Sequence, residues 1–170
     1  MQPRQSPGRR RRVEALAPGL ALAMVLAVGA GPVAATPTTS TVSLVACAFA
    51  GGGSTTVPAG NNVVIQFGLL SDTAGYVRDF IAASTTVASI DGSVIPNANR
   101  YWSTPSRYDP SGWVTYWRYG IGTLGSGEDV AVVFNVSLAH VVVGGRGPDP
   151  SRFGPGNIFD PDLACTITGA

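Results

Sequence analysis

Apolar and polar residues alternate in several separate stretches of this chain, which is the period-two pattern of half-buried β-strands. The longest stretch is 130–143, in which every second residue from Val130 to Leu138 is a large apolar one. Val63, Ile65 and Phe67 alternate in the same way within 62–69. Further strands are predicted on the same grounds, or from a local enrichment in aromatic and β-branched residues, over 41–49, 85–90, 100–104, 112–119 and 163–167.

Residues typical of turns separate these stretches. Asp91-Gly92 is a strong hairpin signal, and Gly and Pro mark further turns at 57–61 and 125–128. One segment follows helical spacing instead: Tyr76, Val77, Phe80 and Ile81 come after Asp72 and Thr73, either of which can cap a helix. A short helix and a strand over 76–81 both remain open for this segment. Residues 144–161 are rich in Gly and Pro and predict a long irregular loop.

This series of elements predicts an all-β fold. We expect an immunoglobulin-like antiparallel β-sandwich of about seven strands with at most one short helix, over residues 41–170. A loose polar lead of residues 36–40 is expected to come before it.

The first 35 residues have the features of a signal peptide. Arg9 to Arg12 precede an apolar stretch over 16–30, and the small residues Val33-Ala34-Ala35 follow. The prediction is therefore an exported protein, secreted or held at the cell envelope, with no membrane span after cleavage. Retention of 16–35 as a membrane anchor is the alternative, and its Pro and Gly residues disfavour a permanent spanning helix.

Removal of this segment reverses the net charge. Residues 36–170 contain six arginines, no lysine and nine acidic residues, so their formal charge is −3. Nucleic-acid binding depends on cationic side chains that neutralise phosphates. The composition therefore argues against a nucleic-acid partner.

The chain has two cysteines, Cys47 and Cys165, near the two ends of the predicted domain. Because exported proteins fold in an oxidising environment, the sequence predicts a disulfide that joins the terminal strands. The alternative is a lipid on Cys47, since Leu44-Val45-Ala46-Cys47 is similar to a bacterial lipobox. The polar run 36–41 separates this motif from the apolar stretch, and lipidation would leave Cys165 without a partner.

An aromatic strand, the Gly-Ser-Gly-Glu turn and an alternating Val/Phe strand follow one another over residues 117–138. This segment resembles the closing hairpin of bacterial immunoglobulin-like surface domains of the cell-adhesion-related (CARDB-type) group. The resemblance implies that Leu124 packs under the turn and that Gly127 takes its tight corner. It covers this hairpin only, and it implies a fold, which by itself does not determine a function.

The residues that catalysis commonly needs are scarce. His140 is the only histidine, Glu128 is the only glutamate after residue 35, and no Gly-x-Ser-x-Gly motif occurs. We therefore predict a protein that is not an enzyme and needs no cofactor. Four residues of the last loop carry oxygen ligands of the kind that calcium prefers, but they equally suit turns, so no metal is predicted and they remain weak candidates. They are Asp149, Asn157, Asp160 and Asp162.

Seven aromatic residues lie within the 19 residues from Tyr101 to Tyr119. Exposed aromatic rings can stack on sugars or on an apolar partner, whereas the alternative places a tryptophan in the core. We expect an aromatic platform, with Trp117 or Trp102 exposed, flanked by the loop after Val143. The candidate ligand-binding residues are Trp102, Trp113, Trp117, Tyr119, Arg146 and Arg152.

The sequence thus predicts a non-catalytic secreted or cell-surface domain with a structural or adhesive role. Its expected partners are a cell-wall glycan or another surface protein. The alternative is a carbohydrate-binding module that uses the exposed aromatic strand.

Overall fold

Two long antiparallel strands, β3 (Asn62–Ser71) and β7 (Gly112–Thr123), form the centre of the first sheet. They belong to a computed structural model that describes residues 38–147 and 151–170. The short strands β1 (Thr39–Ser43) and β6 (Ser106–Asp109) lie at the two edges, which gives the order β1-β3-β7-β6. The central strands carry the alternation that the sequence showed, with Val63, Ile65 and Phe67 buried.

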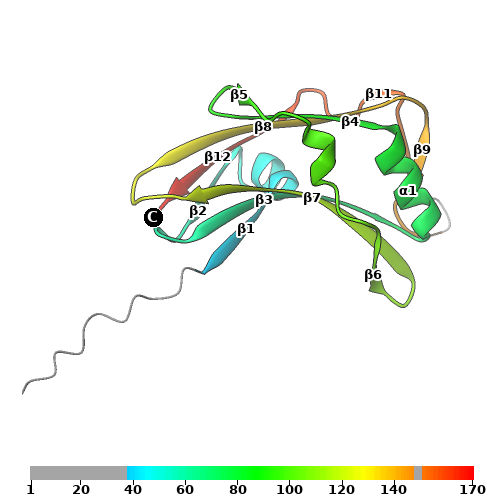
Figure 1. The fold of residues 1–170 in the computed structure, drawn as a ribbon, viewed down its shortest axis with the longest axis horizontal. Helices are drawn as coiled ribbons and strands as arrows, with labels where there is room; N and C mark the ends of the chain where they lie inside the picture. Colours follow the sequence, from blue (N-terminus) through cyan, green and yellow to red (C-terminus); the bar gives the residue numbers. More distant parts are fainter. Residues whose placement is uncertain (1–37, 148–150) are drawn as a thin grey trace, which may run out of the picture. The chain divides into compact units, whose positions relative to one another are not determined.

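The second sheet faces the first across the core (Figure 1). Its order is β2-β12-β8-β4-β5, and β11 pairs with the end of β8. β9 (Val142–Gly144) and β10 (Ser151–Phe153) form a separate antiparallel pair. The bounds of the second sheet are Ser54–Val57 for β2, Ser84–Ile90 for β4, Ser93–Val94 for β5, Asp129–Leu138 for β8, Gly156–Asn157 for β11 and Leu163–Gly169 for β12.

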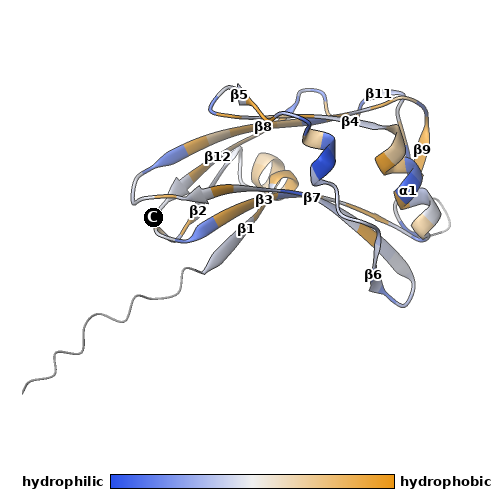
Figure 2. Cartoon of the chain, viewed as in Figure 1, coloured by the Kyte–Doolittle hydropathy of each residue, from blue (hydrophilic) through white to orange (hydrophobic). Residues whose placement is uncertain are grey.

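These two layers confirm the predicted all-β sandwich. Apolar segments alternate with polar ones along the strands of both sheets (Figure 2). Trp117 and Phe67 of the first sheet meet Phe134 of the second, with ring centroids 4.8 and 5.3 Å from that of Phe134. All five alternating residues from Val130 to Leu138 are buried, as predicted. Leu124 is buried at the turn, and Gly127 has the positive φ of 75° that a tight corner needs.

The N-terminal segment contributes one strand to each sheet. β1 runs parallel to β3, the chain then makes a single π-helical turn, η1 (Ala46–Ala50), and β2 runs parallel to β12. Cys47 lies buried in this turn and forms the predicted disulfide with Cys165 of β12, with the Cα atoms 5.7 Å apart. The prediction of one strand over 41–49 is wrong beyond Ser43, because the chain has to leave the first sheet to reach the second.

One α-helix, α1 (Ala74–Ala83), connects β3 to β4 at one end of the sandwich (Figure 1). The Thr73 hydroxyl accepts a hydrogen bond from the Tyr76 amide at 3.2 Å, which satisfies a free donor of the first turn. Val77 and Phe80 point into the core and are fully buried. The helix interpretation of this segment is therefore confirmed, and the strand alternative is wrong.

The predicted strand over 100–104 is replaced by a 3₁₀-turn, η2 (Ala98–Tyr101), and an isolated bridge between Trp102 and Trp117. The Asn99 side chain stands where a neighbouring strand would pair with β4. Its Oδ1 accepts from the Thr86 amide at 2.6 Å, and its Nδ2 donates to the Ser84 carbonyl at 2.8 Å. This local side-chain pairing satisfies the edge of β4 without a strand.

Three further boundaries differ from the sequence prediction. The expected strand 130–143 breaks after Leu138, where the Ala139 amide donates to the Ala83 carbonyl of α1 at 3.0 Å. The expected loop 144–161 contains β10 and β11. In the expected loose lead, β1 begins at Thr39, and Ser40 accepts a hydrogen bond from Asn61.

The predicted signal peptide, residues 1–35, lies outside the described residues. No helix within 38–147 and 151–170 has both the length and the apolar composition that are needed to cross a membrane.

Replacing both cysteines with alanine (Cys47→Ala with Cys165→Ala) should destabilise the domain. The crosslink spans 118 residues of sequence, and closing a loop of that length removes about 4–5 kcal/mol of unfolded-state entropy in the simple chain model. Urea unfolding of the double variant should therefore show a free energy of unfolding that is lower by nearly that amount. The wild-type protein under reducing conditions should have the same free energy of unfolding as the double variant. An unchanged unfolding midpoint would contradict the structural role of the crosslink.

Candidate functional site

Trp117 lies at the centre of the core and cannot form part of an exposed platform. Its exposed fraction is 0%, and its indole N–H donates to the Ala98 carbonyl at 2.8 Å. The prediction of an exposed Trp117 is wrong, because this face of β7 is covered by the second sheet. The alternative prediction, that a tryptophan of the aromatic strand lies in the core, is confirmed for Trp117.

Trp102 is half-buried rather than exposed as the platform required. Its ring meets Phe67 and Phe80 edge-on, at centroid distances of 5.8 and 5.4 Å. Its indole N–H donates to the Thr86 hydroxyl at 2.9 Å. These contacts place Trp102 at the edge of the core beside η2, where its side chain is only partly accessible to solvent.

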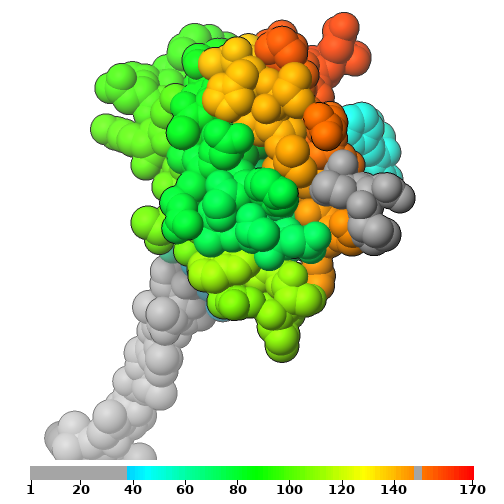
Figure 3. All heavy atoms as spheres, turned by 90° about the vertical axis from the view of Figure 1, so that its right-hand side faces the viewer, coloured from blue at the N-terminus to red at the C-terminus, as the bar shows by residue number. Residues whose placement is uncertain are grey.

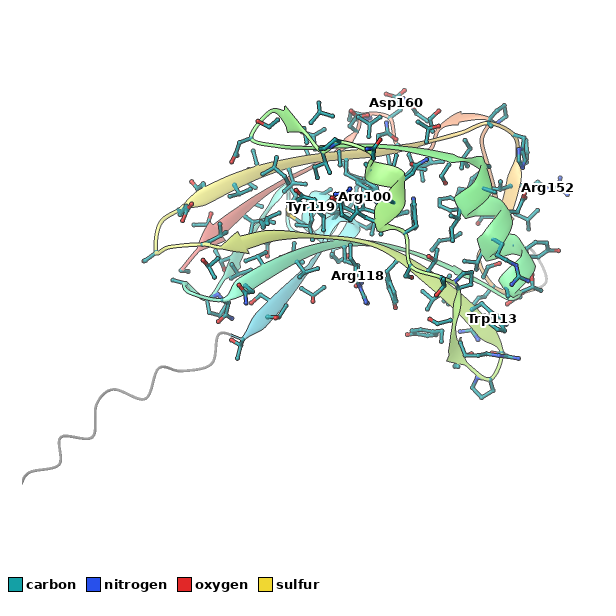
Figure 4. All side chains as sticks on the ribbon, viewed as in Figure 1. Arg100, Trp113, Arg118, Tyr119, Arg152 and Asp160 are labelled. Atoms are coloured by element: carbon teal, nitrogen blue, oxygen red, sulfur yellow. A yellow bond between two sulfur atoms is a disulfide. The ribbon has the colours of Figure 1, made fainter. Side chains whose placement is uncertain are left out.

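Tyr119 also points into the space between the sheets (Figure 4). Its ring meets Tyr101 edge-on at 5.0 Å, and the Arg100 guanidinium lies 4.7 Å from the Tyr101 ring centroid. Tyr119 is therefore a residue of the core rim and belongs to the same aromatic group as Trp117.

Trp113 is half-buried, like Trp102, but it is the one predicted tryptophan that the structure places on a protruding element. It lies near the start of β7, in the β6–β7 hairpin, which bends away from the second sheet (Figures 1 and 4). The Arg107 guanidinium lies 4.8 Å from the Trp113 ring centroid, and Tyr108 between them in sequence is 59% exposed. We refer to Arg107, Tyr108 and Trp113 as the hairpin surface.

Arg146 fixes this hairpin to the body of the domain. It forms a two-pronged pair with the Asp109 carboxylate, with N–O distances of 2.8 and 3.3 Å. It also donates to the Ser111 hydroxyl and lies 4.0 Å from Asp72. The segment after β9 therefore reaches the start of the aromatic strand, as the sequence predicted, but Arg146 binds a carboxylate there and not an aromatic ring.

The other predicted arginine does not join this cluster. Arg152 lies exposed on β10, opposite Val143, and forms no ion pair with the described residues. Its guanidinium is thus separate from the hairpin surface.

The environment of Asp109 favours its charged form. The Ser111 backbone N–H is the main cause that lowers the pKa of Asp109, and the Ser111 hydroxyl and Arg146 lower it further. Partial desolvation opposes these effects without outweighing them. The carboxylate thus remains available to Arg146 down to pH values below the ordinary range of aspartate.

A third arginine–aromatic pair, on the outer face of the first sheet, was not identified from the sequence. The Tyr116 ring lies across Gly68, where a Cβ would come within 3.0 Å of it. The Arg118 guanidinium lies 4.3 Å from the Tyr116 ring centroid and donates to the Gln66 Oε1 atom at 2.7 Å. Alternation alone places Tyr116 and Arg118 on one face, but their partners on β3 depend on the strand register.

The weak calcium candidates do not form a site among the described residues. Asp160 and Asp162 are exposed, and Asp162 accepts a hydrogen bond from the buried Asn135 amide. Asn157 lies in β11, opposite Ser137, and Asp149 is outside the described residues. Within 38–147 and 151–170, no group of three or more His, Cys, Asp or Glu side chains is arranged to hold a metal ion.

His140 is paired with Asp79 of α1 at 3.1 Å, and both side chains are about half exposed. This contact ties the turn after β8 to the helix.

A scan with family models, a search of curated proteins and a search of solved structures each found no match to this chain. The resemblance to CARDB-type immunoglobulin-like domains therefore stays a prediction. The hairpin on which it was based is not formed as a strand pair, because β7 and β8 belong to different sheets and the turn between them connects the two layers.

The Arg146–Asp109 contact should be visible in the pH dependence of the hairpin. The pKa of Asp109 is lowered in the folded protein, so the ionised Asp109 carboxylate stabilises the fold. This stabilisation is complete above the ordinary pKa of about 3.9, and it is lost as the pH falls through the lowered pKa. We expect the NMR signal of the Trp113 indole to titrate with a midpoint below that ordinary value. Arg146→Ala should raise this midpoint only part of the way toward the ordinary pKa, because the hydrogen bonds from Ser111 remain.

Arg152→Ala is the matched control for this titration, because Arg152 is an exposed arginine without an ion pair among the described residues. Equal midpoints in wild type and Arg146→Ala would show that Arg146 does not act on Asp109.

Proposed function

We propose that this protein is an exported, non-catalytic domain that acts by adhesion at the cell surface, and that the hairpin surface contacts its partner. The observation that carries the proposal is the placement of Arg107, Tyr108 and Trp113 together on one protruding hairpin. These side chains lie on a hairpin that extends from the sandwich, and the Arg146–Asp109 pair holds that hairpin in place.

The chemistry of the hairpin surface suits a binding role. Trp, Tyr and Arg are the residue types that contribute most to binding at protein interfaces. A contact surface that is already ordered loses less conformational entropy on binding than a flexible one. The hydrogen bond from Arg107 to the Pro110 carbonyl at 2.7 Å and the stack of Arg107 on Trp113 both order this surface before a partner arrives.

Export is supported by the crosslink and by the N-terminal sequence. Disulfides persist in oxidising compartments, and the Cys47–Cys165 bond connects the turn that follows the first strand to the last strand. The basic and apolar N-terminal segment has the composition of a signal peptide. We also propose the immunoglobulin-like description of the sandwich, which rests on its two facing sheets and on the turn that carries the chain from β7 in one sheet to β8 in the other.

Carbohydrate binding is the second candidate, and the outer face of the first sheet favours it. Tyr116, Arg118 and Gln66 place a ring, a planar guanidinium and an amide side by side on one face. Planar groups beside hydrogen-bond donors and acceptors are suited to the apolar faces and hydroxyls of sugars. A cell-wall glycan is the partner that this arrangement would bind.

Trp113→Ala and Arg107→Ala should each weaken binding to intact cells or to isolated envelope proteins. Substitutions at interface hot spots weaken binding by about 2 kcal/mol or more, which corresponds to roughly thirtyfold. Tyr76→Ala is the control, because Tyr76 is a 40% exposed aromatic residue on α1, outside the hairpin. Binding can be measured by surface plasmon resonance or by sedimentation with cells.

Two further variants, Tyr116→Ala and Arg118→Ala, separate the two candidates on purified cell-wall glycan. Loss of glycan binding in Tyr116→Ala and Arg118→Ala, with normal binding in Trp113→Ala, would favour the carbohydrate-binding module. If neither envelope proteins nor glycan bind, or if all variants bind like wild type, the proposed contact surfaces are wrong.

A further inference from the structure

A cavity of about 200 Å³ opens at the β1 edge of the first sheet, and hydrocarbon side chains line it. Phe67, Phe80, Phe153 and Phe159 provide most of its wall, together with Leu69. The structure brings these residues together from β3, α1, β10 and the segment that follows β11.

The mouth of the cavity is a gap in the sheet edge. β1 ends at Ser43, opposite Gln66, and the next segment on this edge is Gly145, which bridges Ser71. Residues 67–69 therefore have a strand partner on the β7 side only. Val45, which is 37% exposed, and Ile158 line the cavity beside this gap. Ala48 and Phe49 of η1 line a neighbouring hollow together with residues 158–164, and cyan atoms lie beside orange ones on this side of the domain (Figure 3).

The rings that line the cavity are packed against one another and against residues outside it. Phe67 packs edge-on against Trp102 and Phe159, at 5.8 and 5.5 Å, and is 5.3 Å from Phe134. Phe153 lies directly on Gly144, where a Cβ would come within 2.8 Å of its ring. The cavity therefore cannot collapse by a simple movement of one ring.

We propose that this cavity is a binding site for a small hydrocarbon group, either an aromatic ring or the end of an alkyl chain. An apolar cavity of about 150 Å³ in another protein stays free of water and binds benzene, so this larger one has room for a substituted ring or a short chain. No side chain on its wall offers water a hydrogen bond. The inference is independent of the proposed adhesive function, because none of these residues belongs to the hairpin surface.

The test uses toluene and 1-octanol as probes, with the signals of the Leu69 and Ile158 methyl groups followed by NMR. We expect saturable shifts of both signals with at least one probe. Saturation by toluene alone indicates a ring site, and saturation by octanol alone indicates a chain site. Val45→Trp should weaken binding by about tenfold or more, because the larger side chain fills the mouth.

Val133→Trp is the matched control, because Val133 is 38% exposed on β8, close to the exposed fraction of Val45 and outside the cavity. This variant should bind like wild type. If Val45→Trp does not fold, Ile158→Trp fills the cavity from the other side of the mouth and should have the same effect. Absence of saturable shifts with both probes, or equal binding by the filled and control variants, would overturn the proposal.

Discussion

The crossing of the N-terminal segment from one sheet to the other is the constraint on which much of this structure depends. β1 pairs with β3, β2 pairs with β12, and only the turn η1 lies between them. The Cys47–Cys165 bond fixes this turn against β12, so β1 has to stop at Ser43. The same bond closes almost the entire domain into one covalent loop, which limits the freedom of the unfolded chain.

Patterns along the chain predicted the parts of this fold that depend on local sequence. The alternation from Val130 to Leu138 placed β8 and its buried face correctly, and Thr73 marked the start of α1. The position of Cys47 in a helical turn could not be predicted in this way, because the turn exists only to join two sheets. Likewise, alternation put Trp113, Trp117 and Tyr119 on one face of β7, but only the length of the covering second sheet determines which of them is buried.

The candidate sites depended even more on long-range contacts. Arg146 was placed near the aromatic strand from the sequence, yet its partner, Asp109, had no distinguishing pattern. The pair of Tyr116 and Arg118 follows from alternation, while the roles of Gly68 and Gln66 require the register of β3 against β7. The cavity has no sequence signal at all, since its phenylalanines come from four separate segments.

Both the hairpin surface and the cavity result from the same feature of the first sheet, which is the shortness of its edge strands. β3 and β7 have 10 and 12 residues, whereas β1 and β6 have only 5 and 4. Short edge strands limit unwanted pairing with other chains, but they leave parts of the central strands without a neighbour. On the β1 side this leaves a gap that opens into the core, and on the β6 side it leaves a hairpin that extends past the second sheet. The core between these edges is closely packed around Trp117 and Phe134. The hairpin surface and the cavity therefore lie at opposite edges of one sheet, on either side of this core.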